Sequence, residues 1–224
     1  MSFDWTPVIL TIELAAVSTL ALLVLGTPLA WWLARARSRL AVLVEGVTAL
    51  PLVLPPTVLG FYLLLVLGPR GPIGATWEGI GGPRLVFSFW GLCVGSVVYS
   101  LPFVVQPLAN GFRALDLKLL EAASVLGASP FDRFATIVFP LTRPAFLAAA
   151  TLGFAHTVGE FGVVLMIGGN LPGQTNVVSI AVYDHVECLD YASAHALSAG
   201  LLVFSTVVLV IVYASNRRFR LLGP

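Results

Sequence analysis

Two ionisable side chains lie inside a long apolar stretch, and they are the first candidates for chemistry. His156 and Glu160 fall within residues 155–171, four positions apart and therefore on one face of a predicted helix. Ionisable groups are expensive in such a segment, so they mark either a functional site or a structural lock, meaning a pair that holds helices together. We favour a lock between Glu160 and either His156 or a neighbouring helix. A gate is the alternative.

Three prolines interrupt a second apolar stretch. Pro51, Pro55 and Pro56 remove three backbone donors within six residues and must kink or break a helix. One interpretation is a packing kink covered by neighbouring helices. The other is a discontinuous helix whose second half starts near Pro56. Its free amides from Thr57 to Gly60, together with the Thr57 hydroxyl, would then offer a positive helix end to an anion.

Other kinds of site are poorly supported. A metal centre built from His156, His185 and Glu187 is the sharpest alternative, but these residues are scattered and two different environments are predicted for the histidines. No Gly-rich loop ending in Gly-Lys-Ser/Thr is present, so we expect no ATP hydrolysis by this chain. We therefore expect no catalytic residue, metal or cofactor in the chain itself.

The segment at residues 110–143 carries the signals of two short helices. Asp116 is a good N-cap for a helix over residues 117–126, and Gly127 can close that helix in the left-handed conformation. Ser129 caps the second helix, with Pro130 at its first position. Three apolar residues fall on one face of the second helix at helical spacing: Phe131, Phe134 and Val138. The helices either lie on the membrane, pack under the helix bundle or dock a partner.

The elements that position these residues are membrane spans. The chain has 224 residues, of which 58% are apolar and only 10% charged, which is far from the composition of a water-soluble domain. Five stretches are long enough to cross a bilayer: residues 8–33, 42–67, 85–108, 145–167 and 196–214. A sixth, residues 177–186, is too short to span and is expected to lie at the outer surface or to be partly re-entrant. Without repeats or linkers, residues 1–224 are predicted to form a single all-α membrane domain.

The basic residues orient these spans. With five spans, ten of the twelve Lys and Arg residues fall on one side, which the positive-inside rule assigns to the cytosol. They are Arg35, Arg37, Arg39, Arg113, Lys118, Arg133, Arg143, Arg217, Arg218 and Arg220. The amino terminus is therefore predicted outside, and the carboxyl terminus and the loop at residues 110–143 inside.

The cytosolic loop resembles the coupling loop of ABC importer permeases. Its matching residues are Glu121, Ala122, Ala123, Gly127, Ile137 and Pro140, with Phe139 where that family usually has leucine. In that family the loop forms coupling helices that sit in a cleft of the ATP-binding subunit. The resemblance implies that the loop docks an ATPase, whose ATP-driven closure rotates the membrane helices.

Longer stretches narrow the resemblance. PLVLPPTVLGFYLLLVLG, HTVGEFGVVLMIGGNLPGQT and SIAVYDHVECLDY are similar to segments of molybdate/tungstate permease subunits. This family implies a type I importer in the cytoplasmic (inner) membrane. Its parts would be two copies of this chain, two ATP-binding subunits that hold ATP and Mg²⁺, and an extracytoplasmic oxyanion-binding protein. No nucleic acid is involved. The lock at Glu160 suits this cargo, because a bare carboxylate on the path would repel an anion.

Two alternatives remain open. Sulfate permeases carry a similar Gly-Glu-Phe-Gly stretch, so sulfate or thiosulfate is the second candidate cargo. A non-ABC secondary transporter or channel would need carboxylate relays, inverted repeats or a ring of pore charges, and none is visible in the sequence.

Overall fold

The computed structural model describes residues 4–221, and the side chains of residues 4–211. All regular structure in this part of the chain is helical, which confirms the predicted fold class. The elements in chain order are α1 (Thr6–Arg35), α2 (Arg39–Ala49), η1 (Leu50–Leu52), α3 (Pro56–Leu67), α4 (Pro72–Gly79), α5 (Phe89–Arg113), α6 (Leu117–Val125), α7 (Pro130–Arg133), η2 (Phe134–Val138), α8 (Phe139–Val158), α9 (Gly162–Gly168), α10 (Val178–Glu187) and α11 (Tyr191–Leu221).

Five segments of the described chain are long and apolar enough to cross a membrane, as predicted. They are Thr6–Arg35, Pro56–Gly79, Phe89–Arg113, Pro130–Val158 and Tyr191–Ile211. The sixth apolar stretch forms α10, a helix of 10 residues that is too short to span. The side chains of Arg217, Arg218 and Arg220, on which part of the orientation argument rests, lie outside the described side chains.

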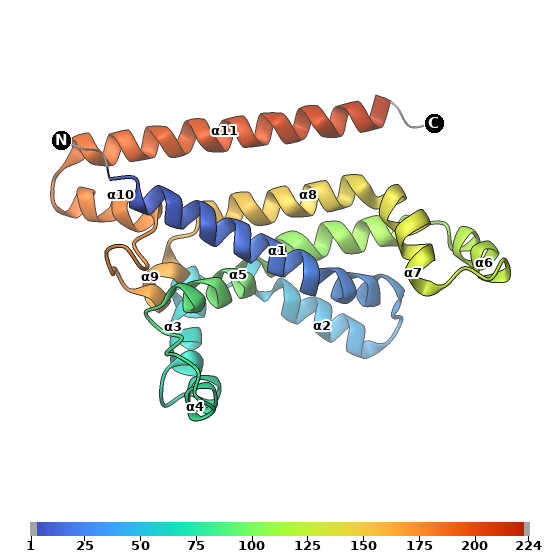
Figure 1. Ribbon diagram of the computed structural model, residues 1–224, viewed down its shortest axis with the longest axis horizontal. Helices are drawn as coiled ribbons and strands as arrows, with labels where there is room; N and C mark the ends of the chain where they lie inside the picture. The colour runs from blue at the N-terminus through green and yellow to red at the C-terminus, as the bar shows by residue number, and fades with distance from the viewer. Residues whose placement is uncertain (1–3, 222–224) are drawn as a thin grey trace.

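Helices α1, α5 and α8 run side by side along the long axis and form the centre of the molecule (Figure 1). Their shared core includes Leu22, Val104 and Phe112. Small residues let the backbones approach: a Cβ added to Gly153 on α8 would lie 2.7 Å from the Val104 Cγ2 on α5. Helix α11 lies along this bundle, and most of its residues over 191–211, whose side chains are described, are exposed, as expected of a helix that faces lipid.

The second predicted span, residues 42–67, is broken at its prolines, as the sequence predicts. Helix α2 ends at Ala49, and α3 begins only at Pro56, with Pro55 as its N-cap. In Figure 1, α3 leaves the bundle at a steep angle to α2 and leads into α4. The interpretation as a discontinuous helix restarting near Pro56 is confirmed. Proline has no N–H to leave unpaired at the first helical position, so a restart there is favourable.

The fourth predicted span, residues 145–167, is not one continuous helix, contrary to the prediction. Helix α8 ends at Val158 and α9 starts at Gly162, so Glu160 lies in the break between them. The backbone carbonyl of Glu160 accepts a hydrogen bond from the Ser179 hydroxyl of α10 at 2.6 Å. A side chain from another helix thus satisfies a polar group that a continuous helix would have paired internally.

The two broken helices pack against each other. A Cβ added to Gly162 would lie 2.8 Å from the Pro56 Cβ, and one added to Gly60 would lie 2.8 Å from the Met166 Cβ. Gly162 therefore lets α3 and α9 approach closely. Gly159 makes no such contact, because an added Cβ would meet only backbone oxygens of its own helix end, at 3.7 Å or more.

We predict that Gly162→Ala destabilises the protein, because its new methyl group would overlap Pro56 and force α3 and α9 apart. Overpacking of this kind costs about 1–3 kcal/mol. Thermal unfolding in detergent measures the effect. The control is Gly200→Ala on α11, where an added Cβ meets nothing within 4 Å. Equal stability of both variants would contradict the close contact.

Candidate functional site

The loop predicted over residues 110–143 projects from one end of the bundle and carries α6 and α7 (Figure 1). The first helix, predicted over residues 117–126, is confirmed as α6 to within one residue. An Asp116 carboxylate oxygen accepts from the Lys118 N–H at 3.0 Å, so Asp116 is the N-cap. Gly127 has φ +83°, which confirms that it closes the helix in the left-handed conformation.

The start of the second helix is confirmed as a capping box. The Ser129 hydroxyl accepts from the Asp132 N–H at 3.1 Å, and the Asp132 carboxylate accepts from the Ser129 N–H at 3.2 Å. Pro130 occupies the first helical position. The Ser129 hydroxyl also donates to the Asp132 carboxylate, at 2.6 Å.

The second helix is not a separate element, contrary to the prediction. After Arg133 it passes through the π-turn η2 directly into α8. The expected shared face is wrong for the same reason: Val138 is buried in the bundle core and Phe134 packs against that core, whereas Phe131 is 77% exposed.

The exposed apolar surface of this loop is formed by other residues than predicted. Val125 and Leu126 at the end of α6 are 88% and 86% exposed, and with Phe131 they form what we call the apolar tip. The Arg133 guanidinium donates to the Ser124 hydroxyl, which ties α6 to α7. Glu121, Ala122, Ser129 and Pro130 are exposed, and Ala123, Ile137 and Pro140 are partly buried.

A buried polar centre lies in the bundle where α5 meets the end of α8. The His156 Nδ1 lies 2.8 Å from the Ser100 hydroxyl, which lies 3.1 Å from the Thr157 hydroxyl. The His156 ring stacks on Phe103 at 3.9 Å between centroids and lies beside Tyr99 at 4.7 Å. Sequence reasoning found His156 and missed its hydroxyl partner. The spacing of Ser96 and Ser100, four residues apart in an apolar helix, was an available signal.

Glu160 stands next to this centre, 3% exposed. Neither carboxyl oxygen has a hydrogen-bond partner, and no ion pair with His156 forms. The prediction that His156 and Glu160 share a helix face is wrong, because α8 ends at Val158 before reaching Glu160. The Ser96 hydroxyl of α5, itself buried and unpartnered, faces the Glu160 carboxyl.

The proline break supplies fewer free donors than predicted. The amides of Val58 and Leu59 both donate to the Pro55 carbonyl, at 3.0 and 3.2 Å, so they are not free. The Thr57 side chain is exposed, whereas Gly60 is buried against α9. Of the predicted path residues, the structure brings Pro56 and Gly60 against α9, next to the break that contains Glu160.

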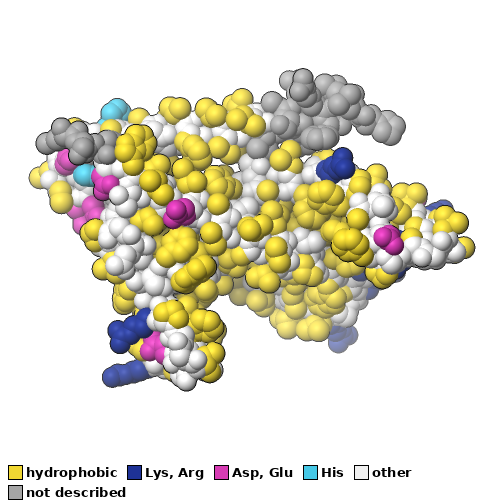
Figure 2. Space-filling model, in the orientation of Figure 1, with side chains coloured by type: hydrophobic (Ala, Val, Ile, Leu, Met, Phe, Trp, Pro, Cys, Tyr) yellow, Lys and Arg dark blue, Asp and Glu magenta, His cyan; other side chains and the backbone are white. Residues whose placement is uncertain are grey.

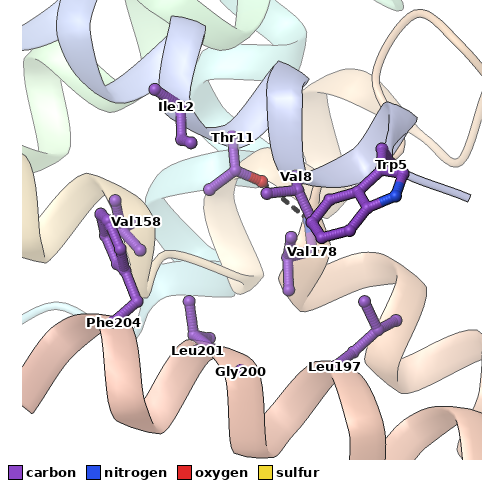
Figure 3. Close-up of a pocket in the computed structure, with 10 residues that line it drawn as sticks. All are labelled: Trp5, Val8, Thr11, Ile12, Val158, Val178, Leu197, Gly200, Leu201 and Phe204. Atoms are coloured by element: carbon purple, nitrogen blue, oxygen red, sulfur yellow. Dashed lines mark hydrogen bonds between the residues drawn. The ribbon is translucent and has the colours of Figure 1, made fainter. Parts of the chain in front are cut away.

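The pocket shown in Figure 3 has a different character. Its volume is about 240 Å³, and it lies between α1, α8, α10 and α11 under an almost wholly apolar lining that includes Trp5, Leu201 and Phe204. The Thr11 hydroxyl there is already used: it donates to the Pro7 carbonyl and accepts from the Val178 N–H at 2.9 Å. An oxyanion would lose its hydration there against an almost wholly apolar lining.

The metal alternative is not supported by the described residues. His185 lies 3.3 Å from an Asp190 carboxylate oxygen on the far side of α10, while His156 is held by Ser100 in the bundle. Within the described side chains no three His, Cys, Asp or Glu groups are close enough to hold a metal ion.

Comparison with known proteins identifies the family of this chain. Residues 26–221 match the family described as binding-protein-dependent transport system inner membrane component. The chain belongs to this family. The molybdenum transport system permease protein ModB of Azotobacter vinelandii is 58% identical over 217 residues, covering 97% of this chain and 96% of that protein.

More distant members share the fold. A probable sulfate transport system permease protein, cysT of Prototheca wickerhamii, is 31% identical over 90% of this chain and 79% of its own. The crystal structure of a bacterial alginate ABC transporter, in complex with an alginate pentasaccharide-bound periplasmic protein, superposes with a TM-score of 0.76. That match covers 98% of this chain and 80% of the other, at 18% identity. The fold is that of an ABC importer permease.

We predict that Ser129→Ala loosens α7. Losing an N-cap hydroxyl costs about 1 kcal/mol, so amides of α7 should exchange with deuterium about fivefold faster. Hydrogen exchange with mass spectrometry measures the change. Thr136→Ser keeps a hydroxyl in the next turn, where Thr136 donates to the Asp132 carbonyl, and should leave exchange unaltered.

Proposed function

We propose that this chain is the translocating subunit of an ATP-driven importer for molybdate or tungstate. The observation that carries the cargo is the 58% identity, over nearly the full length of both chains, to a permease named for molybdenum transport. Sulfate is the second candidate, supported by the more distant sulfate permease. Membership in an importer permease family disfavours a secondary transporter or a channel.

The apolar tip is the surface we assign to the ATPase partner. Val125, Leu126 and Phe131 are large, apolar and exposed at the end of a loop that caps, a left-handed glycine and a side-chain bond hold rigid. An exposed apolar group of this kind marks a contact with another molecule. The ATPase would bind ATP and Mg²⁺, and its movement would reach the membrane through α7, η2 and α8.

The charge distribution supports the proposed orientation in the cytoplasmic (inner) membrane. Basic residues adjoin the end that carries the apolar tip: Arg35 closes α1, Arg113 closes α5, and Lys118 lies on α6. At the opposite end, Asp184 and Glu187 of α10 lie near His185, and Figure 2 shows acidic and histidine side chains gathered there. The tip would therefore face the cytosol.

The number of docking loops per chain, which is one, indicates how many subunits the complex would contain. One loop engages one ATPase subunit, so a second copy of this chain and a second ATPase give closed two-fold symmetry. The apolar α3 and α4, which leave the bundle with Tyr62 and Ile80 exposed, need further protein or lipid around them. An extracytoplasmic binding protein would deliver the oxyanion at the opposite end.

Uptake into vesicles tests the cargo. The complex, reconstituted with its ATPase and its binding protein, should accumulate molybdate only with ATP present. Tungstate should compete with molybdate, and a hundredfold excess of sulfate should not. Equal competition by sulfate would transfer the assignment to the sulfate class. Accumulation without ATP would contradict an ABC importer.

The docking surface makes a separate prediction. Burying a Phe side chain is worth roughly 1.5–3 kcal/mol, so Phe131→Ala should weaken ATPase binding by about tenfold or more. Membrane insertion should be unchanged, because Phe131 makes little contact within the chain. The matched control is Leu202→Ala on α11, an apolar side chain 69% exposed at the lipid-facing surface. Co-purification of the ATPase with each variant measures the difference.

A further inference from the structure

Glu160 is the only Asp or Glu that is buried among the side chains at residues 4–211. Both of its carboxyl oxygens are enclosed by atoms of this chain, and neither has a hydrogen-bond partner. Because the enclosure is complete within one chain, a second copy of the permease or a passing oxyanion cannot reach those oxygens in this conformation. Groups of this chain alone must therefore offset the cost of burying the Glu160 carboxyl.

The groups around Glu160 do not neutralise a negative charge. Helix α5 contributes Ser96, which faces the carboxyl, and Tyr99, which lies within electrostatic range. Helix α8 contributes His156, whose Nδ1 is engaged by Ser100. Helix α10 contributes Ser179, whose hydroxyl bonds the Glu160 backbone carbonyl and not its carboxyl.

No Lys, Arg or His among the described side chains forms an ion pair with the Glu160 carboxyl. The ion pairs among the described side chains are Arg113 with Glu45 and His185 with Asp190, and neither involves Glu160. An ionised carboxylate taken from water without a partner costs several kcal/mol. A neutral carboxylic acid avoids that cost, and it can donate its proton to a single hydroxyl such as Ser96.

We propose that Glu160 is a proton-binding site, and that closure of the break between α8 and α9 around its side chain is linked to the uptake of one proton. The carboxylate takes the proton from water before it is enclosed, so one negative charge disappears and one O–H donor forms. When the break opens and water returns, the carboxyl releases the proton. The conformation seen here is the proton-loaded one.

This arrangement couples a conformational step to a chemical one. A state that binds a proton is favoured over a state that does not as the proton concentration rises. The site itself rests on the geometry, and only its link to transport rests on the proposed function. The direct test is therefore a measurement that needs neither cargo nor ATP.

Infrared spectroscopy of the assembled complex reads the carboxyl directly. With ¹³C-glutamate incorporated into this chain, the wild-type protein should show at neutral pH an isotope-shifted C=O band of a neutral carboxylic acid. Glu160→Gln should lose that band. The matched control is Glu78→Gln, since Glu78 also has an unpartnered buried oxygen but a partly exposed side chain. In this control the band should remain.

Three results would overturn the proposal: absence of the band in the wild type, its persistence in an assembled Glu160→Gln complex, or its loss in Glu78→Gln. If Glu160→Gln fails to assemble, the wild type and the Glu78→Gln control still decide the matter. In assembled complexes Glu160→Gln, a permanent mimic of the neutral acid, should also lose the contribution of Glu160 to the pH dependence of uptake. An unchanged pH profile in that variant would overturn the link to transport while leaving the cargo assignment intact.

Discussion

The need to satisfy every backbone polar group without water governs this structure. A bilayer offers no hydrogen bonds, so a helix can break inside it only where other protein groups replace the lost pairing. Both breaks meet this condition. At the first, the Pro55 carbonyl accepts from two amides of α3, and Pro56 has no amide hydrogen to satisfy. At the second, the Ser179 hydroxyl reaches across from α10 to the Glu160 carbonyl.

The two breaks depend on each other for packing. Gly162 lets α9 lie directly on the start of α3 at Pro56, and Gly60 lets α3 lie on Met166. Glycine costs helix stability, but at a crossing it permits a contact that any side chain would prevent. The irregular segments thus cover one another, and the rest of the bundle is built from ordinary apolar helices around Val104 and Phe112.

Local signals in the sequence were reliable, and the assumption that the fourth span is continuous was not. The Asp116 cap, the left-handed Gly127 and the capping box at Ser129 depend on neighbours within a few residues, and all three are confirmed. The first break follows from local prolines and is predicted. The end of α8 involves a partner distant in the sequence, Ser179 for Glu160, so hydropathy alone ran across that break. The predicted lock between His156 and Glu160 is wrong. The partner of His156 is instead Ser100, which lies 56 residues away in the sequence. The roles of Thr57 and Gly60 in translocation stay predictions.

Because α7 continues through η2 into α8, the number of residues between Pro130 and Val158 is constrained. Pro130–Val158 forms one continuous helical segment of 29 residues that bends at η2, with Phe131 of the apolar tip near one end and the α8–α9 break at the other. The π-turn holds one additional residue per turn and so sets the angular phase between the two ends. Adding or deleting one residue in this segment would turn one end by about 100° relative to the other. The segment therefore has a fixed register, and its length matters to the proposed coupling as much as the residues of the apolar tip.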